Sequence, residues 1–247
     1  VQRLPQYGNT LFLNGEDAVV YRQRQKDARN PDVRDEKNIE RDAYNLGMNA
    51  AWFDVGAPLA ENRSSLIVDP PDGRIPPLTP AAKAQMIPCR GGCGPQGMVP
   101  RDTIGPRESV MKSETLAEHV TDRSLMERCL IISQGPPFNP FAYNNNVHIL
   151  HHKDMVVIET EMVHTARIVW LDGRPRPSAA VQTWHGVSRG RWDGDTLVVE
   201  TTNFRPDARW FGVLKPEHFT LVERLTRVDA DTVLYEYTMN DPATPLV

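Results

Sequence analysis

The chain has 247 residues, of which 40% are hydrophobic and 24% are charged, and its formal net charge is −4. This length and composition predict one sizeable globular domain with additional irregular segments rather than two full domains. The charges form no basic stripe that would indicate nucleic acid as a partner, and no run of about eighteen apolar residues predicts a membrane span.

Residues 1–137 are predicted to form a proline-rich, partly helical arm that packs on the domain after it. The proline-rich loop 69–80 has few repeating apolar positions and makes no hydrogen-bonded ladder of its own. The charged stretch 22–44 allows a helix from about residue 35 to 46 or a solvated surface segment, and we favour the second. Residues 113–132 are the better helix candidate, because Ser113 is a suitable N-cap and apolar residues follow along one face.

The three cysteines give two open alternatives. Cys89 and Cys93 lie in a glycine-rich loop, and Cys129 follows later. A structural zinc ion needs four ligands, and no second pair of cysteines lies downstream. A disulfide between Cys129 and either loop cysteine is chemically reasonable in an oxidising compartment, and unpaired thiols are the alternative.

From residue 138 onward, apolar and polar residues alternate with a period of two between turn signals. The turns are expected at 153–154, 172–173, 193–195 and 229–231. Strands joined by connections this short pair antiparallel. We therefore predict a mainly β fold in which 138–247 form an antiparallel meander of roughly seven strands. Its twist would curl the sheet into a barrel or half-barrel, as in lipocalins.

Several long motifs resemble a family of uncharacterised secreted bacterial proteins that are abundant in soil bacteria. They are NRSSLIVDPPDGRIPPLTP at 62–80, YNNN at 143–146, EMVHTARIVWLDGRP at 161–175 and SRGRWDGDTLVVETTNF at 188–204. The resemblance covers most of residues 62–242 and implies a periplasmic or secreted location, but it carries no established activity. Family members usually have a Gln-rich segment at 147–152 and Met-Gly-Asp at 185–187. A function that depended on the histidines there would be peculiar to this chain.

A candidate catalytic group lies at 159–167. Glu159 and Glu161 share one face of the predicted strand, and a bend at Val163 would bring His164 and Arg167 close to Glu161. A carboxylate that orients an imidazole makes a general base near neutral pH, while the arginine would hold an anionic form of the substrate. Tyr143, at the start of the meander, is the candidate proton donor. A structural ion-pair network at one end of the barrel is the competing interpretation.

The histidines allow a metal site but do not favour one. His148 and His152 would share one strand face while His151 points the other way, and Glu161 or His185 would have to complete the ligand set. Four residues on a strand span roughly 13 Å, which is too far for one ion unless the strand bulges. We therefore expect no metal and no other cofactor.

Five residues are candidates for substrate binding, and each has a structural alternative. The tryptophans are also typical core residues, and an asparagine at the start of a strand is also typical of a turn. Trp184 and His185 would lie on opposite faces of a strand, so only one of them could point inward. The candidates are Trp184, His185, Asn145, Trp170 and Glu159.

Two arginines after the candidate site are expected to form cross-strand ion pairs, so their presence does not require a ligand. Arg189 and Arg191 flank Gly190 and share a face, and Glu200 or Glu223 on neighbouring strands would pair with them.

Three classes of function remain. The first is a cofactor-independent acid–base enzyme, a lyase, isomerase or hydrolase, that acts on a small apolar or aromatic compound in the cup of the barrel. The second is a secreted binding protein that holds such a compound without turning it over. The third is an interaction role in a homo-oligomer, in which the arm 69–80 completes the sheet of another subunit. The chain contains no Walker or HExxH motif. A GxGxxG string at 92–97 and a GxSxG string at 186–190 are present, but neither has the strand–turn–helix context that dinucleotide binding or a serine elbow requires, so nucleotide cofactors and serine-elbow hydrolysis are disfavoured.

Overall fold

The structure is a computed structural model that describes residues 3–29, 62–75, 77, 80, 86–88, 98–100, 128–130, 135–139, 144–205 and 218–240. The chain divides into two compact units. The first comprises Val1–Pro77 with Phe141–Asn144, and the second comprises Leu78–Pro140 with Asn145–Val247. Much of 1–137 lies outside the described residues, so the predicted boundary between 137 and 138 stays a prediction. The expected helix at 35–46, the loop cysteines and most of the expected helix at 113–132 also fall there. Residues 128–130 of the second helix are described and form a turn instead, with a positive φ of 53° at Cys129, which is an exposed free thiol.

The first unit contains a 3-10 turn, η1 (Pro5–Tyr7), and a helix, α1 (Gly15–Arg29). Asn14 begins the helix: its side-chain oxygen accepts a hydrogen bond from the Asp17 amide at 2.9 Å, and its amide nitrogen donates to the Asp17 carboxylate. The first of these bonds satisfies one backbone donor of the first turn, and the second holds the two side chains together. One side of α1 is buried against the preceding segment through a small apolar cluster of Tyr7, Leu13, Ala18 and Tyr21.

The segment 62–75 folds around a buried arginine. Arg3 is 3% exposed, and its Nε donates to Ser64 Oγ at 2.7 Å while its Nη1 donates to the carbonyls of Gly8 and Pro71. Gly73 approaches Arg3 closely with a positive φ of 67°, a conformation that favours glycine. The hydrogen bonds from the Arg3 guanidinium to Ser64 and Pro71 therefore hold the turn in this proline-rich segment.

The second unit contains a short antiparallel pair, β1 (Met86–Pro88) and β2 (Met98–Pro100), and a seven-stranded sheet in the order β3 to β9. A 3-10 turn, η6 (Met162–His164), separates β4 from β5. The strands are β3 (Val147–His152), β4 (Met155–Thr160), β5 (Ala166–Trp170), β6 (Val187–Asp193), β7 (Thr196–Thr202), β8 (Thr220–Arg227) and β9 (Val233–Asn240). The expected period of two is thus confirmed for most of 147–240.

One predicted connection is wrong. Asp172-Gly173 does not close a hairpin, because β5 and β6 pair parallel through Val169–Ser188 and Trp170–Arg189. Residues 171–186 form a long irregular connection before β6, in place of the short turn expected at 172–173. A connection of this length allows the chain to cross over and enter the sheet in the same direction, which a two-residue turn does not. All other neighbouring strands in the sheet pair antiparallel.

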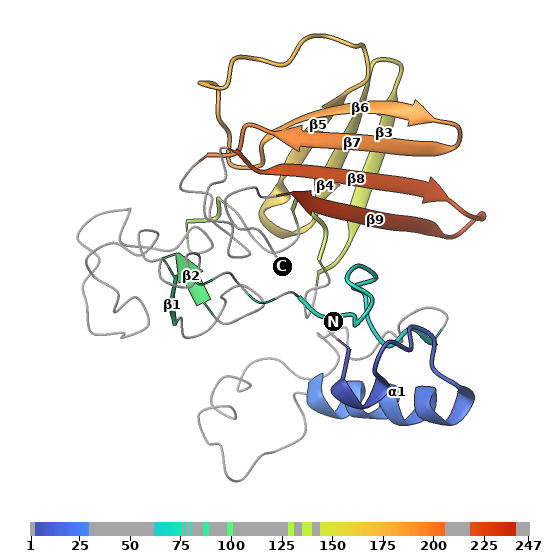
Figure 1. The fold of residues 1–247 in the computed structure, drawn as a ribbon. Coiled ribbons are helices and arrows are strands. Elements are labelled where there is room, and N and C mark those ends of the chain that lie inside the picture. Colours follow the sequence, from blue (N-terminus) through green and yellow to red (C-terminus); the bar gives the residue numbers. More distant parts are fainter. Residues whose placement is uncertain are drawn as a thin grey trace. The chain divides into compact units, whose positions relative to one another are not determined.

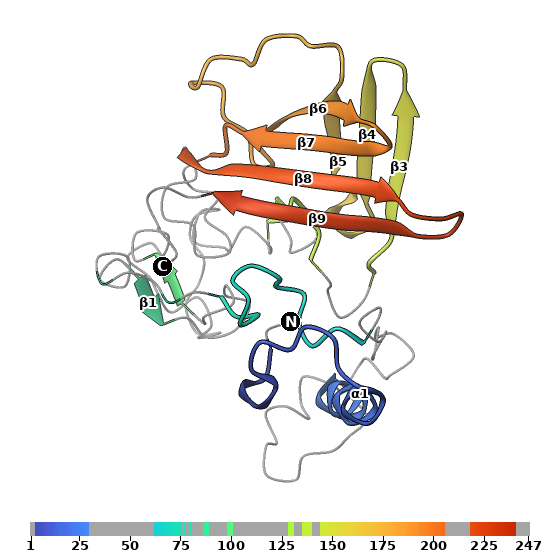
Figure 2. The ribbon, with the colours of Figure 1, turned by 45° about the vertical axis from the view of Figure 1, so that its right-hand side comes forward.

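The sheet curls into a half-barrel. Figures 1 and 2 show β3–β5 behind β6–β9, with the two sets of strands crossing steeply. The curl brings the rings of His151 on β3 and Trp192 on β6 within 5.6 Å, although β4 and β5 lie between these strands in the sheet. The core between the two layers consists of Val156, Ile158, Val169, Leu197, Val199 and Leu225. We call the face that carries these side chains the inner face.

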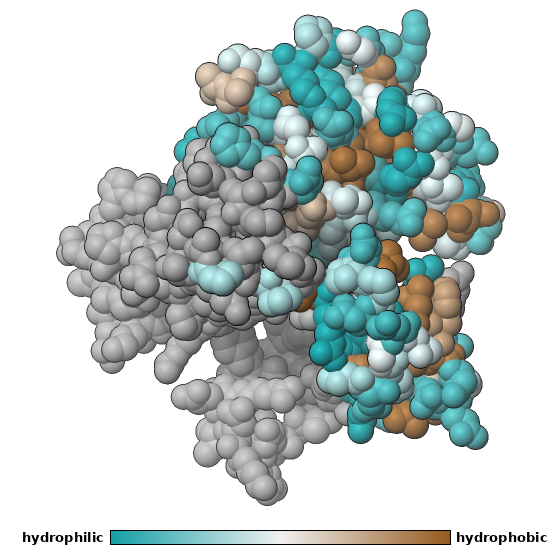
Figure 3. All heavy atoms as spheres, in the orientation of Figure 1, coloured by the Kyte–Doolittle hydropathy of each residue, from teal (hydrophilic) through white to brown (hydrophobic). Residues whose placement is uncertain are grey.

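The outer surface is mixed in character. Figure 3 shows hydrophilic and hydrophobic residues interspersed over the visible part of the sheet. Among the described residues, no helix is both long and apolar enough to cross a membrane.

Candidate functional site

A buried ion pair lies within the apolar inner face. Arg167 on β5 faces inward beside Val169, and Glu223 on β8 faces inward between Leu221 and Leu225. The guanidinium binds the carboxylate in a bidentate manner: Nη2 donates to Oε1 at 2.9 Å, and Nη1 donates to Oε2. Glu223 is completely buried. Removing two charges from water is costly. The ion pair offsets this cost only if its geometry is good and further hydrogen bonds satisfy the remaining polar atoms.

A tyrosine supplies one of these further bonds and links the pair to a separate segment. Tyr235 on β9 donates its hydroxyl to Glu223 Oε1 at 2.8 Å. The same oxygen of Tyr235 accepts a hydrogen bond from the backbone N–H of Phe138 at 3.0 Å. Burial and the negative charge of Glu223 raise the pKa of Tyr235 well above its usual value, so the hydroxyl stays protonated and keeps donating.

Phe138 lies over this polar network. Its ring centroid is 5.5 Å from the Arg167 guanidinium carbon and 5.0 Å from the centroid of the Tyr235 ring. Phe138 belongs to a segment, Gly135–Asn139, that we call the GPPFN segment. Tyr237 holds its other end by donating a hydrogen bond to Asn139 Oδ1 at 3.1 Å. Gly135, Pro136 and Pro137 are buried. The chain thus places one of its own aromatic rings on the guanidinium face.

His185 completes the group. Burial and the positive charge of Arg167 lower the pKa of His185 to about 4, so its imidazole is neutral at pH 7. The ring is close to the GPPFN segment, since a Cβ on Gly135 would be 3.8 Å from His185 Cδ2. We call Arg167, Glu223, Tyr235, Phe138 and His185 the inner cluster.

The structure does not bring the predicted catalytic group together. Arg167 is buried against Glu223, whereas Glu161 and His164 are exposed. The Glu161 carboxylate accepts a hydrogen bond from the Asn146 side chain at 2.7 Å. The expected bend at Val163 is present within η6, where Val163 has a φ of 65° and His164 a φ of 49°. Tyr143 lies outside the described residues.

The histidines near β3 lie on both faces of the strand, as predicted. His148 is on the outer face opposite Glu159, and its Nδ1 is 3.6 Å from Glu159 Oε2 with both side chains exposed. His151 is on the inner face, where it contacts Trp192. Within the described residues, no group of three or more His, Cys, Asp or Glu side chains is arranged to hold a metal ion.

The substrate-binding candidates are scattered. Trp184 and His185 lie in the turn before β6 rather than on a strand, so the predicted alternation of faces does not apply to them. Arg205 lies over the Trp184 ring at 4.4 Å. Trp170 is on the outer face, covered by Arg174 at 3.5 Å from the ring centroid. Asn145 precedes β3 and is half-buried. Of the predicted substrate-binding residues, His185 is the one that joins Arg167.

Arg189 does not form the cross-strand pairs that were expected with Glu200 or Glu223. Glu200 lies opposite Arg189 across β6 and β7, but it accepts a hydrogen bond from Arg176 at 2.7 Å instead. Glu223 faces the other side of the sheet and is occupied by Arg167.

Three members of the inner cluster were not predicted, namely Glu223, Tyr235 and Phe138. A signal for Glu223 exists in the sequence, because Leu221, Glu223 and Leu225 share one face of a strand and a carboxylate between two leucines requires a buried partner. The chain matches no protein-family model, no curated protein and no solved structure. The resemblance to secreted bacterial proteins therefore stays a prediction.

Proposed function

We propose that the half-barrel is a binding module for a small uncharged aromatic molecule, and that the ligand's ring takes the place of the Phe138 ring. The observation that carries this proposal is the placement of Phe138, with Arg167 facing the ring at 5.5 Å and the Tyr235 ring at 5.0 Å. A guanidinium attracts the negative face of an aromatic ring, and the attraction increases where water is excluded. These contacts depend on an aromatic ring and not on a phenylalanine.

The charges of the inner cluster favour an uncharged ligand. Arg167 is already neutralised by Glu223 in a bidentate pair. An anionic ligand would have to displace a buried carboxylate, and a cationic one would be placed beside a guanidinium. Both would add an unpaired charge to an apolar core.

The hydrogen bonds favour a ligand that carries a donor. The Tyr235 hydroxyl donates its hydrogen bond to Glu223, so its oxygen can only accept further bonds, and it accepts one from the Phe138 N–H in this structure. A phenol, benzyl alcohol or benzamide could offer an equivalent O–H or N–H beside its ring. The proposed class is therefore an uncharged aromatic compound with an adjacent donor.

Binding fits the described geometry better than catalysis does. The predicted base, His164, and its carboxylate, Glu161, are exposed and separate from Arg167, and the low pKa of His185 makes it a weak base. The acid–base enzyme stays a prediction. A lipocalin-like cup and a periplasmic or secreted location belong to the proposal and are supported by the half-barrel and by the resemblance to secreted proteins.

The proposal is tested by removing the competing ring. Phe138→Ala should bind phenol at least about tenfold more tightly than the unaltered protein, because the chain's own ring no longer occupies the seat. Isothermal titration calorimetry would compare phenol with anisole, which lacks the donor, and with cyclohexanol, which lacks the aromatic ring. Both should bind more weakly than phenol.

Phe12→Ala is the matched control, since Phe12 is a half-exposed phenylalanine of the first unit. It should leave phenol binding unchanged. Circular dichroism would show that both variants are folded, and Phe138→Leu would keep most of the apolar volume if the alanine variant unfolds. Equal binding of phenol and cyclohexanol, or no gain in either Phe138 variant, contradicts the proposal.

A further inference from the structure

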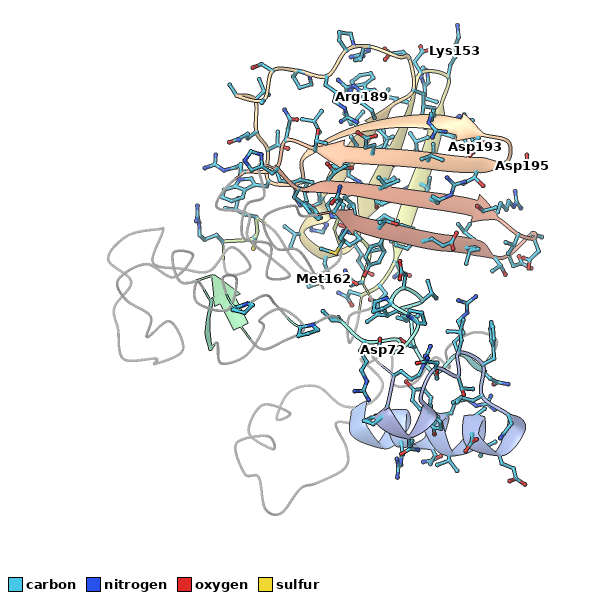
Figure 4. All side chains as sticks on the ribbon, in the orientation of Figure 1. Asp72, Lys153, Met162, Arg189, Asp193 and Asp195 are labelled. Atoms are coloured by element: carbon cyan, nitrogen blue, oxygen red, sulfur yellow. The ribbon has the colours of Figure 1, made fainter. Side chains whose placement is uncertain are left out.

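Three arginines gather on the outer face where β5 and β6 pair. Arg174 and Arg176 come from the connection 171–186, and Arg189 comes from β6. Trp170 and Arg189 are opposite each other in the parallel pair, so they share the outer face. Figure 4 labels Arg189 beside this connection.

Two of these arginines have carboxylate partners, and one does not. Arg174 pairs with Asp172, and Arg176 donates to Glu200 at 2.7 Å. The Arg189 guanidinium instead donates to three carbonyl oxygens, of Arg174 at 3.3 Å and of Pro175 and Ser188 at 3.1 Å. No carboxylate of the described residues pairs with Arg189. A third carboxylate, Asp154, also attracts Arg174, so the carboxylates among the described residues lie at Arg174 and Arg176, and Arg189 is the arginine that pairs with none of them.

The surroundings of Arg189 make its positive charge costly. Partial burial lowers the pKa of Arg189, and the like charges of Arg176 and Arg174 lower it further, while Asp172 offsets this only in part. A positive charge that is partly removed from water and repelled by its neighbours is one that an anion stabilises.

Unused donors are also available. A guanidinium has five N–H groups, and the hydrogen bonds of Arg189 use one on each nitrogen, which leaves one N–H on Nη1 and one on Nη2. Arg176 donates from Nη1 to Val187 and Thr202 and from Nη2 to Glu200, which leaves its Nε–H and one N–H on Nη2. Forked donors of this kind match the geometry of oxyanions.

We propose that Arg189, together with Arg176, binds a small oxyanion on the outer face of the β5–β6 junction. Carboxylate, sulfate and phosphate share the chemistry that this site recognises. The site lies on the opposite face of the sheet from the inner cluster and does not depend on the proposed aromatic ligand.

Calorimetric titration of the full chain with inorganic phosphate, sulfate and acetate, at an ionic strength held constant with chloride, tests the proposal and ranks the three anions. Arg189→Gln should weaken phosphate binding about tenfold or more, because it removes a charge-assisted hydrogen-bond donor. Arg191→Gln is the matched control, since Arg191 is an exposed arginine on the same strand and face. It should leave the affinity unchanged.

A gain of affinity provides a test that misfolding cannot imitate. Glu200→Gln removes the negative charge that pairs with Arg176, so phosphate should bind about two- to fivefold more tightly. The proposal is overturned if phosphate binds no better than chloride, if Arg191→Gln weakens binding as much as Arg189→Gln does, or if Glu200→Gln leaves the affinity unchanged.

Discussion

Residues Arg167 and Glu223 determine what the inner face of the sheet can hold. Their side chains are 5% and 0% exposed, and each satisfies the charge of the other within a core of valine, leucine and isoleucine. A buried ion pair contributes little net stability compared with apolar residues of the same volume, but leaving one partner alone is very costly. The core therefore tolerates these two charged side chains only while both are present.

Glu223→Gln should therefore destabilise the protein by about 3–5 kcal/mol, because the Arg167 charge would remain buried without a counter-charge. The midpoint of urea unfolding, followed by circular dichroism, measures the loss. Glu200→Gln is the comparison, since it breaks an exposed pair and should cost less than about 1 kcal/mol.

A double variant separates charge from packing. Arg167→Met with Glu223→Leu removes both charges and should recover most of the stability that Glu223→Gln loses. If Glu223→Gln unfolds at the same urea concentration as the unaltered protein, the ion pair is not buried as described.

At the scale of single elements, the sequence predicts the strands better than their connections. Alternation over 147–240 indicates the strands because one face of each is buried, and Asp193–Asp195 and Asp229–Asp231 turn as expected. The parallel pairing of β5 and β6 is a tertiary outcome that no local pattern encodes. Helix α1 includes 22–29, the start of the charged stretch for which a surface segment is the favoured prediction. Apolar periodicity is weak there, and the local signal for the helix is the capping pair of Asn14 and, three residues later, Asp17.

The residues of the candidate site can likewise be selected from the sequence, but which of them lie together cannot. His185 and Arg167 were singled out because imidazoles and guanidiniums are chemically conspicuous, but their proximity depends on the path of 171–186 and could not be read locally. Glu161 and His164 are close in sequence, yet the strand ends before them and leaves both exposed. The Phe138 contact joins residues far apart in the chain, which no spacing rule predicts.

The β5–β6 junction depends on a close approach at Gly190. A Cβ there would lie 2.6 Å from Val169 Cγ1 and 2.8 Å from Leu171 Cδ2. Gly190→Ala should therefore destabilise the protein by about 1–3 kcal/mol through overpacking, as measured by urea unfolding. Gly15→Ala is the control, since a Cβ at Gly15 meets open space. A neutral Gly190→Ala would show that β5 and β6 are not in contact here.

At the scale of the whole molecule, His185 couples stability to pH. Its pKa is about 6.5 in the unfolded chain and about 4 in the folded one. Between these values the unfolded chain binds a proton that the folded chain does not, so stability is complete above pH 6.5 and is lost as the pH falls toward 4. The loss is on the order of 2–3 kcal/mol.

His185→Gln should remove this part of the pH dependence, and His164→Gln, an exposed histidine, should leave it in place. Urea unfolding at several pH values between 4 and 7 gives the slope for each variant. The same slope in His185→Gln and in the unaltered protein would place the titration elsewhere.

Binding of an uncharged aromatic ring at the inner cluster is tested by intermolecular nuclear Overhauser effects between phenol and the folded Phe138→Ala protein. We expect contacts from the phenol ring to the Tyr235 ring and the Arg167 side chain, where the Phe138 ring lies in this structure. Phenol contacts confined to Trp170 on the outer face, or to the first unit, would contradict it.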